Sequence, residues 1–157
     1  MTRQPIAHGS FSIERVYPAT PTRVFAALSD IELKAKWFIG PEQWTPIRRE
    51  MTFEPGGTEI LHGRFPSGAE TLYTARFHDI VENERIVYVY DMHVHGRHHS
   101  LSLTTVEITP DGGGTRLIYT EQVAYLDGTD GAEGIAARER GVGVHLDLLG
   151  RLLGASP

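Results

Sequence analysis

The chain has 157 residues, of which 40% are hydrophobic and 22% are charged, and its formal net charge is −5 at pH 7. This length predicts one domain over residues 1–157, and the acidic balance excludes the basic surface that nucleic-acid binding requires. The absence of cysteine excludes disulfides and thiolate chemistry, and without a signal peptide or a long apolar run we expect a cytoplasmic protein that does not contact a membrane.

The first expected elements are one strand and two short helices. Residues 11–17 alternate apolar and polar side chains, which is typical of a strand. Thr20 and Pro21 supply an N-cap and a first helical residue, and the apolar residues that follow recur at helical spacing. Residues 29–32 have the form of a capping box with Ser29 as the cap, so a second short helix is expected toward Trp37.

Further strands are expected wherever turn-forming residues separate runs of alternating polarity. These runs cover residues 44–53, 58–65, 71–81, 85–95, 101–108 and 115–125. Short connections rich in glycine favour antiparallel hairpins over βαβ units.

The hairpin around Gly96 predicts which residues share a face. A two-residue type II′ loop with Gly96 and Arg97 at its centre pairs His95 with His98. This register predicts an apolar inner face formed by Ile86, Tyr88, Tyr90, Met92, Val94, His99, Leu101 and Leu103. The histidines His93, His95 and His98 then point outward, so an exposed hairpin tip is favoured over a metal site, and no metal is expected.

The last expected element is a long helix over residues 131–153, which begins at a capping box from Asp130 to Glu133. Its apolar residues form one buried stripe of Ile135, Val142, Leu146, Leu149 and Leu153. The helix also contains Gly141, Gly143 and Gly150, each of which costs about 1 kcal/mol in a helix interior. These glycines indicate a kink, or a surface that the sheet or a ligand approaches closely.

Glu121 is a candidate functional residue, because it alternates with Leu117 and Tyr119 and therefore shares their apolar face. A buried carboxylate is costly unless it is paired, hydrogen-bonded or protonated. We expect either a structural ion pair with Arg15 or Arg76, which is favoured, or a cavity acid or base.

Several segments resemble the START-like (SRPBCC) superfamily and, within it, the homologues of the activator of heat-shock-protein-90 ATPase. These segments are residues 19–30, 36–38, 53–57, 115–122, 126–128 and 145–149. The resemblance implies an α+β helix-grip fold, in which a curved seven-stranded antiparallel sheet surrounds a long C-terminal helix. Two short helices after the first strand would close one end of a cavity. The superfamily includes lipid and hormone carriers, polyketide cyclases and aromatases, and cochaperones.

The expected function is the binding of a small, largely apolar or aromatic molecule in an internal cavity, without a cofactor. One alternative is a cyclase- or hydratase-like enzyme that uses Glu121 with His99 or His145 as acid–base groups. Another is a protein-interaction module related to the heat-shock ATPase activators, and a homodimer is the default assembly. The candidate ligand-binding residues are Trp37, Phe38, Tyr73, Tyr88, Tyr90, Met92, His99, Leu101, Leu103, Tyr119, Glu121, Val142, His145 and Leu149.

Overall fold

The computed structural model describes residues 3–154, and its elements follow the expected order. The helices are α1 (Pro21–Ser29), α2 (Ile31–Lys34) and α3 (Gly131–Leu152). The strands are β1 (Ala7–Tyr17), β2 (Thr45–Met51), β3 (Thr58–Arg64), β4 (Glu70–Val81), β5 (Arg85–Val94), β6 (Arg97–Asp111) and β7 (Gly114–Tyr125). No helix within residues 3–154 combines the length and the apolar character that crossing a membrane requires.

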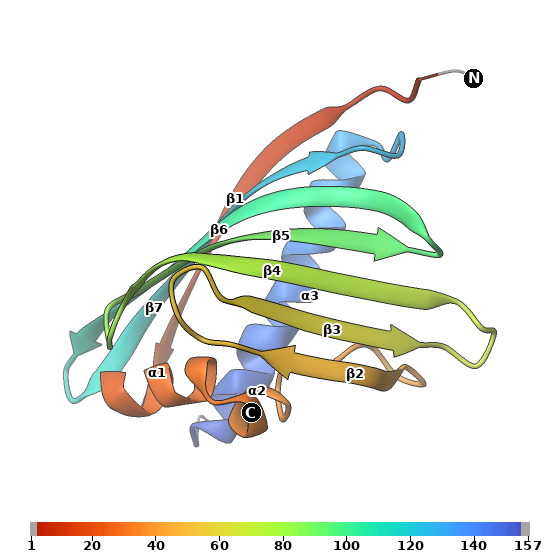
Figure 1. The fold of residues 1–157 in the computed structure, drawn as a ribbon. Helices are drawn as coiled ribbons and strands as arrows, with labels where there is room; N and C mark the ends of the chain where they lie inside the picture. Colours follow the sequence, from red (N-terminus) through yellow and green to blue (C-terminus); the bar gives the residue numbers. More distant parts are fainter. Residues whose placement is uncertain (1–2, 155–157) are drawn as a thin grey trace.

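All strands belong to one antiparallel sheet of seven strands in the order β1-β7-β6-β5-β4-β3-β2. The sheet curves over α3, and α1 and α2 lie at the end of the molecule where α3 finishes (Figure 1). The predicted α+β fold, with a curved sheet, a long C-terminal helix and two short helices after the first strand, is confirmed.

The helix starts follow the capping residues of the sequence, with one correction. The side chain of Thr20 accepts a hydrogen bond from the Arg23 amide at 3.3 Å, and Asp130 accepts one from Glu133 at 3.0 Å. The cap of α2 is Asp30, whose carboxylate accepts from the Leu33 amide at 3.2 Å. The prediction that Ser29 caps this helix was wrong, because Ser29 still belongs to α1 and its hydroxyl donates to the Phe25 carbonyl.

The hairpin between β5 and β6 turns one residue earlier than predicted. Its two central residues are His95 and Gly96, which both have positive φ, at 54° and 73°. Two positive φ values characterise a type I′ turn, whereas the predicted type II′ turn has only one. Val94 therefore pairs with Arg97, and His99 is an extra residue before Met92 pairs with Ser100.

The extra residue His99 reverses the predicted orientation of the part of β6 that follows it. The prediction that Leu101 and Leu103 face inward was wrong, since each is 40% exposed on the outer face. A slip of one residue moves every side chain of a strand to the opposite face. The inward positions are occupied instead by the small polar residues Ser100, Ser102 and Thr104, all of which are buried.

The position of α3 explains why the interior is not completely filled. The strands that α3 contacts most are β1 and β7. There Leu146 and Leu149 join a buried cluster that includes Phe11, Ile13 and Leu117. The inner faces of β3, β4 and β5 lie on the other side of the curved sheet, where the helix does not cover them closely (Figure 1).

Candidate functional site

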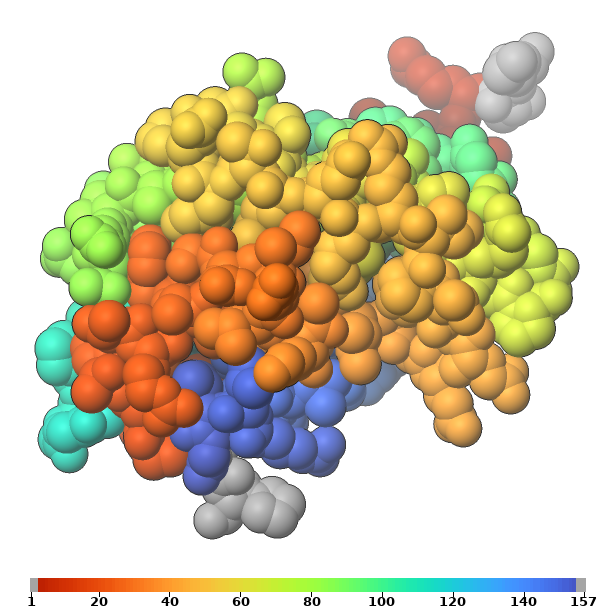
Figure 2. Space-filling model, turned by 60° about the horizontal axis from the view of Figure 1, so that its bottom comes forward, coloured from red at the N-terminus to blue at the C-terminus, as the bar shows by residue number. Residues whose placement is uncertain are grey.

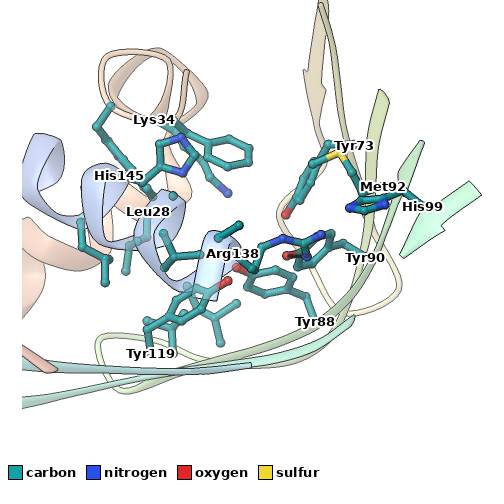
Figure 3. Close-up of a pocket in the computed structure, with 18 of the residues that line it drawn as sticks. Leu28, Lys34, Tyr73, Tyr88, Tyr90, Met92, His99, Tyr119, Arg138 and His145 are labelled. Carbon is teal, nitrogen blue, oxygen red and sulfur yellow. Dashed lines mark hydrogen bonds between the residues drawn. The ribbon is translucent and has the colours of Figure 1, made fainter. Parts of the chain in front are cut away.

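A cavity of about 520 Å³ lies between the inner face of the sheet and α3. This volume is within the range of small-molecule sites, which is about 300–1,000 Å³. Its wall combines aromatic residues of β4, β5 and β7 with residues of the α2 region and of α3 (Figure 3). The wall includes Lys34, Trp37, Phe38, Tyr73, Phe77, Tyr88, Tyr90, Met92, His99, Tyr119, Arg138, Gly141, Val142 and His145.

Strand periodicity produces the tyrosine side of this wall. Tyr88, Tyr90 and Met92 alternate along β5, and Tyr73 of β4 lies opposite Met92 in the register. Alternate residues of a strand point to the same face. The ring centroids of Tyr73 and Tyr90 are 4.9 Å apart, and those of Tyr88 and Tyr90 are 6.2 Å apart. The result is a continuous aromatic surface facing α3.

The cavity has an entrance along α3. A second hollow, of about 390 Å³, shares wall residues with the cavity, including Tyr73, Met92 and Gly141. It continues outward to Trp44 and Val144, and Val144 is 59% exposed. Figure 2 shows the face on which the segment between α2 and β2, in orange, meets the C-terminal half of α3, in blue. A molecule can therefore reach the tyrosine wall between this segment and the helix.

A buried polar network lies behind the wall, centred on Glu121. Its Oε2 accepts hydrogen bonds from the hydroxyl of Tyr90 at 2.6 Å, the hydroxyl of Ser102 at 2.7 Å and Nη1 of Arg138 at 2.9 Å. Its Oε1 accepts from the hydroxyl of Tyr119 at 2.6 Å. Glu121 is fully buried, and both of its oxygens accept hydrogen bonds from donors within the protein.

The predicted ion pair of Glu121 exists, but the predicted partner was wrong. The partner is Arg138 of α3 rather than Arg15 or Arg76. Arg15 instead contacts Asp147 of α3 at 3.0 Å, and Arg76 lies exposed on the outer side of β4.

Arg138 lines the cavity but was not among the site residues expected from the sequence. It also donates to the hydroxyl of Ser100 at 2.8 Å, and its Cζ lies 5.6 Å from the ring centroids of both Tyr90 and Tyr125. Its position was available from helical spacing, because it lies three residues after Ile135 and four before Val142. The expected stripe contained only apolar residues, and Arg138 is the polar residue on the same side of the helix.

Burial and mutual pairing determine the charges in this network. Burial works against the charge of Arg138, yet neighbouring Tyr90 and Glu121 raise its pKa above the ordinary value. Burial, reinforced by the charge of Glu121, raises the pKa of Tyr90 well above its usual range. Tyr90 therefore remains a neutral phenol that donates to the carboxylate and accepts from the guanidinium.

A second buried ion pair lies at the end of the cavity near α2. The ammonium of Lys34 lies 2.7 Å from Oε1 of Glu59, and both side chains are buried. The same nitrogen lies 5.0 Å from the ring centroid of Phe38. Both wall cations, Lys34 and Arg138, are thus neutralised by carboxylates of the protein itself.

Two histidines belong to the wall and have different partners. Nδ1 of His99 lies 2.8 Å from a carboxylate oxygen of Asp127. Nε2 of His145 lies 2.7 Å from the carbonyl oxygen of Ile39. Among the residues that the structure describes, neither histidine is a hydrogen-bond partner of Glu121.

Acidification is expected to destabilise the protein through His145. Burial lowers the pKa of His145, the hydrogen bond to Ile39 opposes this shift, and the charge of Lys34 adds to it. Because the pKa is lower in the folded than in the unfolded state, the contribution of His145 is fully present above about pH 6.5 and is lost as the pH falls. Denaturant unfolding between about pH 7 and pH 5 should show a smaller loss of stability in His145→Gln than in the wild type.

The exposed His78 of β4 offers a matched control for this measurement. His78→Gln should follow the wild-type pH dependence. An unchanged pH dependence in His145→Gln would contradict the assignment of this effect to His145.

The structure distributes the sequence-predicted site residues over three regions. The residues on the cavity wall are Trp37, Phe38, Tyr73, Tyr88, Tyr90, Met92, His99, Tyr119, Val142 and His145. Glu121 lies behind the wall, and Leu149 belongs to the core beneath α3. Leu101 and Leu103 line a hollow on the outer face of the sheet.

The histidine-rich hairpin has a local arrangement of its own. The rings of His93 and His98 stack with centroids 4.5 Å apart, and His98 contacts Asp91 at 2.7 Å. Within residues 3–154, no three histidine, cysteine, aspartate or glutamate side chains are grouped so that they could hold a metal ion.

Comparison with known proteins places this architecture among solved structures. Residues 18–154 match the family described as Activator of Hsp90 ATPase homolog 1-like protein. The Mll3558 protein from Rhizobium loti is 40% identical, with a TM-score of 0.86 over 96% of this chain and 100% of that chain. An uncharacterized protein from Rhizobium leguminosarum is 38% identical, with a TM-score of 0.89 over 97% of this chain and 98% of that chain.

A more distant structure, of the protein CV1439 from Chromobacterium violaceum, shares the fold. It is 23% identical, with a TM-score of 0.75 over 94% of this chain and 98% of that chain. No curated protein matches the sequence.

Proposed function

This chain belongs to the Activator of Hsp90 ATPase homolog 1-like family, and we propose that it binds a small, neutral, largely apolar or aromatic molecule in the cavity beneath its sheet. The observation that carries this proposal is the tyrosine wall. Tyr73, Tyr88 and Tyr90 line a space of about 520 Å³. Concave aromatic surfaces with few polar groups are typical of small-molecule sites.

The charge arrangement supports a neutral ligand. Lys34 and Arg138 each have a buried carboxylate partner, so a charged ligand would have to compete with Glu59 or Glu121. Burying an additional unpaired charge is costly. An uncharged aromatic molecule instead gains contact area with the tyrosine rings without disturbing either ion pair.

The presence of glycine at position 141 is consistent with an open entrance to the cavity. A Cβ added at Gly141 would meet no atom of the described residues within 4 Å, although this glycine lies on the wall of the cavity. Glycine costs a helix interior about 1 kcal/mol relative to alanine. Gly141 thus makes α3 less stable at a position where a larger side chain would narrow the entrance.

The two other functions receive less support. An enzyme based on Glu121 would need an oxygen of that carboxylate free to exchange a proton with a ligand, whereas the donors Tyr90, Ser102, Tyr119 and Arg138 surround it. The family name refers to activation of the Hsp90 ATPase, which would require a protein-binding surface but no internal space. A cavity with an entrance therefore favours ligand binding.

Filling the entrance is expected to abolish ligand binding. The probe is 2-methoxynaphthalene, a neutral aromatic molecule without a hydrogen-bond donor, measured by equilibrium dialysis. We expect saturable binding with one molecule per chain, weakened at least about tenfold in Gly141→Phe because the new ring occupies the entrance.

The matched control is Gly143→Phe. Gly143 lies on the same helix, where a new Cβ would contact only the end of the Arg15 side chain, at 3.5 Å. This variant should bind the probe as the wild type does. The absence of saturable binding in the wild type, or equal binding by Gly141→Phe, would contradict the proposal.

A further inference from the structure

We infer that His99 and Asp127 form a hydroxyl-recognition site, at which Nε2 of His99 accepts a hydrogen bond from an aromatic hydroxyl group of the ligand. This inference rests on the proposed function and narrows it from an aromatic molecule to one that carries a hydroxyl. Three observations support it: His99 lies in the cavity wall, Asp127 is an ionised carboxylate that accepts from Nδ1 of His99, and Nε2 of His99 has no hydrogen-bond partner among the described residues.

A β-bulge brings His99 into the cavity wall. Two residues further along β6, Leu101 points to the outer face, so regular alternation would also turn His99 outward. His99 is instead the extra residue between the pairs His93–His98 and Met92–Ser100. An extra residue re-aims its side chain locally. His99 consequently lies beside Met92 and Tyr73 in the wall (Figure 3).

Asp127 holds the imidazole in one tautomer. Its carboxylate accepts hydrogen bonds from Nδ1 of His99 at 2.8 Å, Nε of Arg97 at 2.9 Å and the hydroxyl of Thr129 at 2.6 Å. Burial opposes the charge, but these donors hold the pKa of Asp127 well below its usual range. Because a carboxylate only accepts, Nδ1 of His99 carries the proton of this contact.

The other nitrogen of His99 is then a free acceptor. In a neutral imidazole with the proton on Nδ1, Nε2 presents a lone pair. Within residues 3–154, Nε2 has no hydrogen-bond partner, and it is not among the polar atoms that are buried without one. Such a nitrogen pairs with an O–H or N–H donor rather than with a carbonyl or an ether.

His145 is the competing acceptor in the wall and is less suited to this role. Its Nε2 donates to the carbonyl of Ile39, so its Nδ1 is the remaining acceptor. In the described part of the chain, no carboxylate is hydrogen-bonded to this ring, and burial together with the nearby charge of Lys34 lowers the pKa of His145. The two histidines therefore differ in the partner that holds each ring, which makes them separable by mutation.

The test compares 2-naphthol with 2-methoxynaphthalene, because these probes have the same ring system and only the naphthol has an O–H donor. By equilibrium dialysis, the wild type should bind 2-naphthol about tenfold more tightly. His99→Phe should bind both probes with nearly equal affinity, because the phenyl ring maintains the contact with Tyr125 but accepts no hydrogen bond.

The matched control is His98→Phe, which removes a neighbouring histidine that is paired with Asp91 and lies outside the cavity wall. It should retain the preference for 2-naphthol. Asp127→Asn should reduce this preference severalfold, and ¹⁵N chemical shifts of the imidazole should show the Nδ1–H tautomer in the wild type.

Three results would overturn the inference while leaving the proposed function intact. They are equal binding of both probes by the wild type, a preference that survives in His99→Phe, and an Nε2–H tautomer in the wild type. Loss of the preference in His145→Phe but not in His99→Phe would show that the acceptor is His145 rather than His99. If the wild type binds neither probe, the proposed function itself fails.

Discussion

Glu121→Gln is expected to lower the free energy of unfolding by about 3–5 kcal/mol. The substitution preserves the shape of the side chain but leaves the guanidinium of Arg138 largely buried without a counter-charge. The substitution would also turn one carboxylate oxygen into an amide nitrogen, which cannot accept a hydrogen bond. The oxygen lost is either Oε2, which accepts from Tyr90 and Ser102, or Oε1, which accepts from Tyr119. Equilibrium unfolding in denaturant at neutral pH measures this loss.

Two further variants show whether the loss comes from the unpaired charge. Removing both partners, in Glu121→Gln combined with Arg138→Gln, should restore part of the lost stability, because no isolated charge remains. Asp147→Asn breaks the much more exposed contact with Arg15 and should cost no more than about 1 kcal/mol. An unfolding midpoint of Glu121→Gln equal to or above that of the wild type would contradict a structural role for this ion pair.

Leu149→Ala is expected to lower the free energy of unfolding by about 2–5 kcal/mol. Leu149 has no exposed surface and packs within the cluster that attaches α3 to β1 and β7. Truncation removes buried methyl groups and leaves a hole that neighbouring side chains fill only in part. Val144→Ala, at an exposed position of the same helix, should change the stability by less than about 0.5 kcal/mol.

The same denaturant unfolding experiment serves both positions. A loss below about 0.5 kcal/mol in Leu149→Ala, which is the range of surface substitutions, would mean that this face of α3 does not attach the helix to the sheet.

The elements and the fold could be predicted because local signals agree with the tertiary structure. Thr20 and Asp130 mark helix starts that the structure retains, and glycine-rich turns separate strands that do pair as hairpins. The prediction for the hairpin at Gly96 failed because the sequence permits a turn one residue earlier and because no local signal marks the bulge at His99. His95 adopts a positive φ, which the prediction reserved for glycine, and the bulge at His99 places Leu101 and Leu103 on the outer face.

The candidate site was predictable where it depends on alternation along one strand. The inward positions of Tyr88, Tyr90 and Met92 follow from the period of two along β5. The partner of Glu121 was not predictable in this way, because it depends on how α3 crosses the sheet. A contact between residues on a strand and a helix requires the packing angle, which no local pattern in either segment contains.

The most direct test of ligand binding in this cavity is an NMR titration of the protein with 2-methoxynaphthalene. Methyl groups report on both faces of the sheet, with Met92 and Val142 on the cavity wall and Leu101 and Leu103 in the hollow on the outer face. We predict intermolecular NOEs from the naphthalene protons to the methyl groups of Met92 and Val142. NOEs to Leu101 and Leu103 instead, or saturable shifts that leave Met92 and Val142 unaffected, would contradict binding in the cavity.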